Sequence, residues 1–216
     1  MTHIVYNGIM NTRDNKQTAP GGYYHIYNRG NAKQDIFYNP EDYNFFLSRL
    51  KLNLFPTDEN DQNRIIALPV DSFSLIGYCL MPNHYHFVVR QNKEISTSKL
   101  VTKLCTSYSK YFNKKYGRVG HLFQDRFKQI NIDDNEYLKW LICYIHQNPK
   151  VAGLTSNPLD YRWSSYGYYV KGRGDIVCEN DIILSQFKNI DEYRKFTDES
   201  YKIIKNKKEI GHLLLD

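Results

Sequence analysis

The sequence predicts a single domain that mixes β-strands with amphipathic helices, an α+β fold. The first observation is a hairpin pattern, in which two strand-like runs over residues 65–80 and 84–91 flank the turn-forming Met81-Pro82-Asn83. The second is a pair of helical patterns, over residues 40–54 and 96–116, in which apolar side chains recur every three or four positions. The third is composition, because 216 residues with 41% hydrophobic content are enough to bury a sizeable core.

The first half of the chain begins with residues 1–19, which are polar, lack periodicity and predict a loosely ordered leader. Tyr23 to Asn28 alternate apolar and polar side chains, as a strand does. Pro40-Glu41-Asp42 then place a proline and two acidic residues at the start of a helix of about four turns. A polar loop over residues 56–64 follows and leads into the hairpin.

The second half continues with the helix over residues 96–116, whose lysines lie largely away from its apolar stripe. Residues 117–128 start with a glycine turn and predict an alternating strand with basic and amide side chains. A capping-box pattern at Asp133 and Glu136 then opens a helix. Pro149 disfavours its continuation, so we expect the helix to end there.

Two histidines, His84 and His86, open the second strand of the hairpin. Alternate residues of a strand share a face, so both imidazoles project together while Tyr85 and Phe87 point the other way. Neutral imidazole is a common metal ligand, and two on one rigid strand form half of a metal site. The pair is equally consistent with a polar strand face whose histidines are hydrogen-bonded to their neighbours.

Tyr144 and Asn148 are four residues apart in the predicted helix over residues 133–149, so they share a face one turn apart. The two side chains can therefore address a single point near the end of the helix. Simpler interpretations exist for each residue alone. The chain has 19 tyrosines, and a helical tyrosine usually packs with its hydroxyl at the surface, while an asparagine at a helix end is often a C-cap.

The charge balance favours a polyanionic partner, since the formal net charge is +6 and the pI is about 9.0. Arg118, Arg126 and Lys128 cluster in one predicted strand and are candidate contacts to nucleic-acid phosphates. The lysines of the helix over residues 96–116 are as consistent with a solvated face as with phosphate contact.

Membrane and secreted classes are not expected from the sequence. No apolar run approaches the length of a membrane span, and no charged start precedes an apolar segment as in a signal peptide. The four cysteines are widely spaced in apolar surroundings, which is typical of reduced core residues rather than of disulfides or a zinc site. We therefore expect a cytoplasmic protein.

Taken together, four motifs resemble the single-tyrosine transposases of the HUH endonuclease superfamily, in particular the branch associated with repetitive extragenic palindromes (REP). Their order matches that of the family and covers roughly residues 20 to 170. The motifs are His84-Tyr85-His86 after Met81-Pro82-Asn83, Gly117-Arg118-Val119-Gly120 leading to Phe123-Gln124-Asp125-Arg126-Phe127, Tyr144-Ile145-His146-Gln147-Asn148-Pro149, and Trp163-Ser164-Ser165-Tyr166.

The resemblance implies a ferredoxin-like, RRM-like antiparallel sheet with helices packed on it, and an enzyme that cuts and rejoins single-stranded DNA next to hairpins. It implies that His84, His86 and Asn148 bind Mg²⁺ or Mn²⁺ and that Tyr144 is the nucleophile, forming a 5′-phosphotyrosine. Some relatives have glutamine where this chain has Asn148. Both monomers and homodimers occur among the relatives, so either state is expected.

The resemblance also divides the chain into a leader over residues 1–19, a catalytic domain over residues 20–170 and a C-terminal extension over residues 171–216. The extension has a helical pattern near residues 191–207 but no motif that we recognise, and it either packs on the core or helps to hold a DNA hairpin.

Two other functions remain open. One is a non-catalytic DNA- or RNA-binding module that stacks bases on exposed aromatic residues of its sheet. The other is a metal-independent phosphoesterase with two His-x-Ser/Thr strands, although only one paired-histidine element, at His84 and His86, occurs in the chain.

Overall fold

The computed structural model describes residues 18–56 and 68–209. Within these residues four strands form one antiparallel sheet in the order β2-β3-β1-β4. The strands and the longer helices are β1 (Tyr23–Arg29), α1 (Pro40–Leu54), β2 (Phe73–Met81), β3 (His84–Gln91), α2 (Thr97–Tyr116), β4 (Lys128–Ile132), α3 (Asn135–Val151), α4 (Tyr166–Lys171), α5 (Asp181–Leu184) and α6 (Ile190–Glu209). This chain order and sheet order form a ferredoxin-like arrangement, which confirms the predicted α+β fold.

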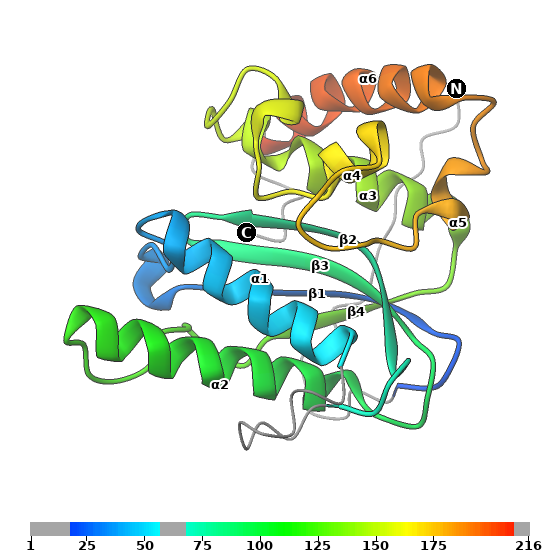
Figure 1. Ribbon diagram of the computed structural model, residues 1–216. Coiled ribbons are helices and arrows are strands. Elements are labelled where there is room, and N and C mark those ends of the chain that lie inside the picture. Colours follow the sequence, from blue (N-terminus) through cyan, green and yellow to red (C-terminus); the bar gives the residue numbers. More distant parts are fainter. Residues whose placement is uncertain (1–17, 57–67, 210–216) are drawn as a thin grey trace.

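Helices cover the sheet from both sides (Figure 1). The ring of Tyr85 in β3 lies 5.2 Å from the ring of Phe46 in α1. Helices α1 and α2 therefore pack on the face of the sheet that carries Tyr85. His86, the next residue along β3, lies with its ring 6.2 Å from that of Tyr144, so α3 packs on the opposite face. The predicted alternation, with Tyr85 and Phe87 pointing away from the histidine pair, is present in the structure.

The predicted elements with the clearest periodicity are confirmed. The helix expected over residues 40–54 is α1, and the Asn39 side chain caps its start by accepting from the backbone of Glu41 and Asp42. The helix expected over residues 96–116 is α2, with Gly117 in the left-handed conformation at its C-terminal end. Residues 1–17 of the predicted leader (residues 1–19), residues 57–64 of the predicted polar loop (residues 56–64) and residues 65–67 of the predicted strand (residues 65–80) lie outside the described residues.

The prediction of a strand throughout residues 117–128 is wrong in most of its length, because β4 begins only at Lys128. Gly117 and Gly120 take positive φ angles of 61° and 92°, so the chain turns back instead of extending. The segment then binds to the end of β1, where the backbone nitrogen of Gln124 donates to the carbonyl of Arg29 over 3.0 Å.

The start and the end of α3 also differ from the prediction by a few residues. Asp134, and not Asp133, is the N-cap, and its side chain accepts from the backbone nitrogen of Glu136 over 2.9 Å. The helix passes Pro149 and ends at Val151. Proline removes one backbone donor, but a helix that stops within the next turn loses little by this.

Gly77 allows α3 to approach β2 closely. A Cβ atom at this position would come within 2.9 Å of the Ile142 side chain and 3.3 Å of the Ser165 hydroxyl. The register of β2 against β3 also shifts between Leu75 and Gly77. A larger residue would therefore push the helix away from the sheet face on which it packs.

The C-terminal helix α6 packs on the outer side of α3 (Figure 1). The fully buried Tyr193 places its hydroxyl 2.7 Å from Nδ1 of His146, and Nε2 of His146 lies 2.7 Å from the Ser165 hydroxyl. Gln147 donates to the backbone carbonyl of Thr197 over 2.8 Å. Of the two roles considered for the extension, packing on the core is the one that these contacts support. No helix among the described residues is long and apolar enough to cross a membrane.

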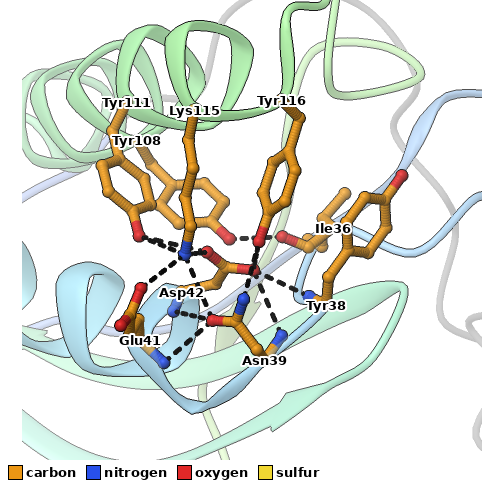
Figure 2. Close-up of polar contacts among 9 residues, drawn as sticks. All are labelled: Ile36, Tyr38, Asn39, Glu41, Asp42, Tyr108, Tyr111, Lys115 and Tyr116. Atoms are coloured by element: carbon orange, nitrogen blue, oxygen red, sulfur yellow. Dashed lines mark hydrogen bonds and ion pairs between the residues drawn. The ribbon is translucent and has the colours of Figure 1, made fainter.

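A buried carboxylate joins the start of α1 to the end of α2 (Figure 2). Asp42 is fully buried and accepts from Lys115 over 2.8 Å, from the Tyr116 hydroxyl over 2.8 Å and from the Tyr38 backbone over 2.8 Å. Burial alone would raise the pKa of Asp42, but these hydrogen bonds outweigh it and lower that pKa below its ordinary 3.8. Asp42 therefore remains charged and fixes α1 against α2.

We expect Asp42→Asn to lower the free energy of unfolding at pH 7 by about 3 kcal/mol, because the change removes the buried partner of Lys115. A group with a lowered pKa stabilises the fold above its ordinary pKa and loses this effect as the pH falls through the folded value. The difference between wild type and variant in urea unfolding should therefore shrink below pH 3.8.

Glu41→Gln is the matched control, since Glu41 binds the same Lys115 nitrogen over 2.9 Å but its side chain is 78% exposed. An exposed ion pair contributes about 0.5 kcal/mol or less, so this variant should unfold almost as wild type does. Equal losses in the two variants would contradict the role given to the buried carboxylate.

Candidate active site

The histidine pair lies on the sheet face that α3 covers. The rings of His84 and His86 are 5.0 Å apart and nearly perpendicular. His86 is fully buried, and His84 at the start of β3 is partly exposed. One histidine is therefore held inside the protein, and the other lies where a solvent-borne molecule can reach it.

Strand register places two basic residues of neighbouring strands beside the pair. Arg29 of β1 pairs with His84, and Tyr27 pairs with His86 on one side and with Lys128 of β4 on the other. Directly paired residues of an antiparallel sheet share a face, so Arg29 lies beside His84, and Lys128 lies one strand farther away, beyond Tyr27. The ammonium group of Lys128 lies 5.7 Å from the centre of the Tyr27 ring. The result is a positive rim beside two imidazoles.

Each histidine is oriented through its Nδ1 atom. Nδ1 of His84 lies 2.6 Å from the Asn83 side-chain oxygen, which accepts only, so His84 carries a hydrogen on Nδ1. Nδ1 of His86 lies 3.0 Å from Nε2 of His25, a fully buried residue of β1. Burial, followed by the charges of His84, His25 and Arg29, lowers the pKa of His86 well below 6.5. His86 is therefore neutral at pH 7, the form that binds metal ions.

Helix α3 brings Tyr144 to this face. The Tyr144 ring lies 6.2 Å from the His86 ring, edge to face, and 5.7 Å from the Trp140 ring, on which it stacks. Tyr144 is buried, with 3% of its surface exposed. The two aromatic contacts fix the ring, so its hydroxyl is directed by the helix and not by a mobile loop.

Asn148 lies one turn beyond Tyr144 on α3. It is buried, and its Nδ2 atom is shielded from solvent and has no hydrogen-bond partner among the described residues. It does not act as a C-cap, because the helix continues to Val151. A buried amide nitrogen without a partner costs free energy, so it calls for a functional explanation.

The donor set fits a divalent ion of the Mg²⁺ or Mn²⁺ class in its chemistry. Nδ1 of His84 is bound to the Asn83 side-chain oxygen, and Nδ1 of His86 is bound to Nε2 of His25, so a metal ion would bind each ring through its Nε2 atom. Asn148 adds an amide oxygen, a ligand that hard cations accept. Residues 18–56 and 68–209 contain no group of three or more His, Cys, Asp or Glu side chains suited to a metal, so this set depends on the asparagine.

The three predicted DNA-binding residues do not form one cluster around the histidines. Lys128 is exposed on the histidine face, and Arg126 is exposed in the segment just before β4. Arg118 lies at the end of α2, where it donates to the Gln34 side chain over 3.1 Å and its guanidinium lies over the Phe112 ring. No described contact joins Arg118 to either histidine.

His25 and Arg29 are site residues that the sequence did not reveal. His25 is 61 positions from His86 and belongs to no motif, so sequence spacing carries no signal for it. Arg29 follows directly on the strand predicted over Tyr23 to Asn28 and belongs to none of the four motifs. Knowledge of the β1–β3 register would have found both, because it pairs Arg29 with His84 and sets His25 near His86.

Comparison with known families gives a match over the part of the chain that contains these residues. Residues 67–148 match the family described as "Transposase IS200 like". The matched range includes His84, His86, Tyr144 and Asn148. No curated protein sequence matches the chain.

Solved structures add a likeness in fold. The structure of the REP-associated tyrosine transposase bound to a REP hairpin is similar, with a TM-score of 0.55 and 16% sequence identity over 74% of this chain and 87% of that chain. A protein from Deinococcus radiodurans R1 described as a candidate transposase has a TM-score of 0.38 and 12% identity over 62% of this chain and 96% of that one. The first likeness supports the fold, and the second is too weak to support an argument.

Proposed function

With an IS200-like transposase domain over residues 67–148 as the premise, we propose that the chain is a single-tyrosine transposase. It nicks and rejoins single-stranded DNA next to hairpins through a 5′-phosphotyrosine intermediate, with Mg²⁺ or Mn²⁺ as cofactor. It acts in the cytoplasm as a monomer or homodimer. The single observation that carries the proposal is the position of Tyr144, whose ring lies 6.2 Å from that of His86 on the helix that covers the histidine pair.

The proposed roles follow from the chemistry of a phosphodiester. The Tyr144 hydroxyl oxygen loses its proton and attacks phosphorus, the bond from phosphorus to the 3′ oxygen breaks, and that oxygen takes up one proton and leaves as a 3′-hydroxyl. His84, His86 and Asn148 would hold the divalent ion, which supplies positive charge to the non-bridging oxygens. The phosphotyrosine conserves the energy of the bond, so a later 3′-hydroxyl can attack it and reseal the strand.

The arrangement of the helices argues against the alternative of a DNA- or RNA-binding module that stacks bases on its sheet. A base-stacking sheet needs one open face with exposed aromatic residues. Here α1 and α2 pack on one face and α3 packs on the other, and Tyr24, Tyr27, Tyr85 and Phe87 are all buried. A non-catalytic protein that grips a hairpin by its phosphates is therefore the main competing function.

Incubation with labelled oligonucleotides separates these two functions. The substrates are single strands that contain hairpins from repeats flanking the native gene, each with and without Mn²⁺. The proposal requires metal-dependent nicking and a protein–DNA adduct that survives denaturation. A mobility shift without either product would establish the binding module instead.

We expect the chain to prefer hairpin or single-stranded DNA over a blunt duplex, with an affinity that falls as salt rises. Lysine and arginine contacts release counterions, and each phosphate contact contributes about 0.7 to 0.9 to the slope of log affinity against log salt. Arg126→Ala and Lys128→Ala should each reduce this slope. Arg118→Ala should have a smaller effect, because Gln34 and Phe112 hold its guanidinium. Fluorescence anisotropy across a salt series measures the slopes.

Arg194→Ala is the control, since Arg194 is an exposed arginine of α6 that lies 3.4 Å from Asp191. It should leave both affinity and slope unchanged. Equal binding to the blunt duplex, or an affinity that does not vary with salt, would argue against the proposed contacts.

A further inference from the structure

His25 is a buried histidine whose place in the fold needs an explanation. It is fully buried in the middle of β1, where an aliphatic residue would pack as well and bring no polar atoms. Burying an imidazole is costly unless its nitrogens are hydrogen-bonded. The one described hydrogen bond of its side chain is to His86, with Nε2 of His25 3.0 Å from Nδ1 of His86.

The two rings are also fixed in plane. The His25 and His86 rings are 5.2 Å apart with an interplanar angle of 19°, and Tyr27 stacks on His25 at 5.0 Å and on His86 at 5.6 Å. The hydrogen bond and the stacking therefore limit both the tilt and the rotation of the His86 ring. A ring held in this way presents Nε2 in one direction.

We infer that His25 is a positioning residue for His86, which it holds with a hydrogen on Nδ1 and with Nε2 directed at the metal. The inference rests on the proposed function, which makes His86 a ligand. Asn83 has the same geometry toward His84, since its side-chain oxygen lies 2.6 Å from Nδ1 of that ring. Each ligand would thus have its own orienting acceptor, one from the hairpin turn and one from the neighbouring strand.

This role has a cost inside the protein. When His25 accepts through Nε2, it carries its own hydrogen on Nδ1, a buried atom with no hydrogen-bond partner among the described residues. A residue that only filled space would not keep such an atom. A bond between His86 and a bound metal ion would offset this cost, so His25 should affect metal affinity more than the stability of the metal-free fold.

Two variants of similar size test the inference. His25→Phe keeps a ring in place but removes the acceptor, and His25→Gln supplies a side-chain oxygen at about the distance of the lost Nε2. Calorimetric titration of full-length protein with Mn²⁺ alone should show affinity about 10- to 100-fold weaker in the Phe variant, with most of the loss restored in the Gln variant. Thermal unfolding without metal checks that both variants are folded.

His86→Ala in the same titration separates this inference from the proposed function. If His86→Ala weakens Mn²⁺ binding while wild type, Phe and Gln variants bind alike, the positioning role is wrong and the metal site stands. If the Gln variant loses as much Mn²⁺ affinity as the Phe variant, an acceptor at this position does not restore binding, and the inference is likewise overturned. If His86→Ala binds Mn²⁺ as wild type does, both the site and the inference fail.

Discussion

Tyr144→Phe should abolish the covalent protein–DNA adduct and leave the rest of the protein intact. The change removes only the hydroxyl, so the ring keeps its contacts with Trp140 and His86. The free energy of unfolding should change by about 1 kcal/mol or less. Without the attacking oxygen no phosphotyrosine forms, and loss of a nucleophile lowers the rate by about 10⁴-fold or more. Denaturing gels with labelled hairpin DNA and Mn²⁺ measure the adduct, while binding of hairpin DNA should persist.

Tyr137 is the natural control because it lies on the same helix, about two turns before Tyr144. Tyr137→Phe should retain adduct formation. Mass spectrometry of the wild-type adduct should place the nucleotide on the peptide that contains Tyr144. An adduct on Tyr137 or on any other tyrosine would mean that the metal face is right and the nucleophile wrong.

Periodic patterns predicted the fold well because they reflect burial on one face of an element. The apolar positions of α1 and α2, and the alternation along β3, follow from the side on which each residue is buried. The strand predicted over residues 117–127 is absent although their alternation of residue types is real, because two glycines with positive φ turn the chain back toward β1. The glycine turn itself was expected, but local composition does not show that the residues after it bind to the end of β1 instead of extending as a strand.

The candidate site was predictable where a motif is local and hidden where it depends on strand pairing. The spacing of His84 and His86, and that of Tyr144 and Asn148, indicated shared faces. The assignment of roles came from the family resemblance, and those roles remain predictions. His86 lies against Tyr144 because α3 packs on the sheet, and it contacts His25 because of the β1–β3 register. Neither is encoded in any window of neighbouring residues.

The histidine pair gives the second large effect. His84→Ala and His86→Ala should each abolish metal-dependent cleavage and weaken Mn²⁺ binding by more than about 100-fold, since a direct ligand contributes more than the residues that orient it. The two variants differ in stability. His84 is partly exposed, so its replacement by alanine should lower the free energy of unfolding by about 1 kcal/mol or less. Calorimetry with Mn²⁺ measures the metal affinity, and nicking assays with hairpin DNA measure the cleavage.

His86 is fully buried, so His86→Ala also affects stability. Removing the buried ring leaves a cavity, which should lower the free energy of unfolding by about 3 kcal/mol or more. Urea unfolding should therefore accompany every measurement on it. His121→Ala is the control, since His121 is exposed in the segment between α2 and β4 and is no part of the donor set. It should retain the Mn²⁺ affinity of wild type. If the double variant of His84 and His86 also binds Mn²⁺ as tightly as wild type, the ion is held elsewhere, and the buried amide of Asn148 needs another explanation.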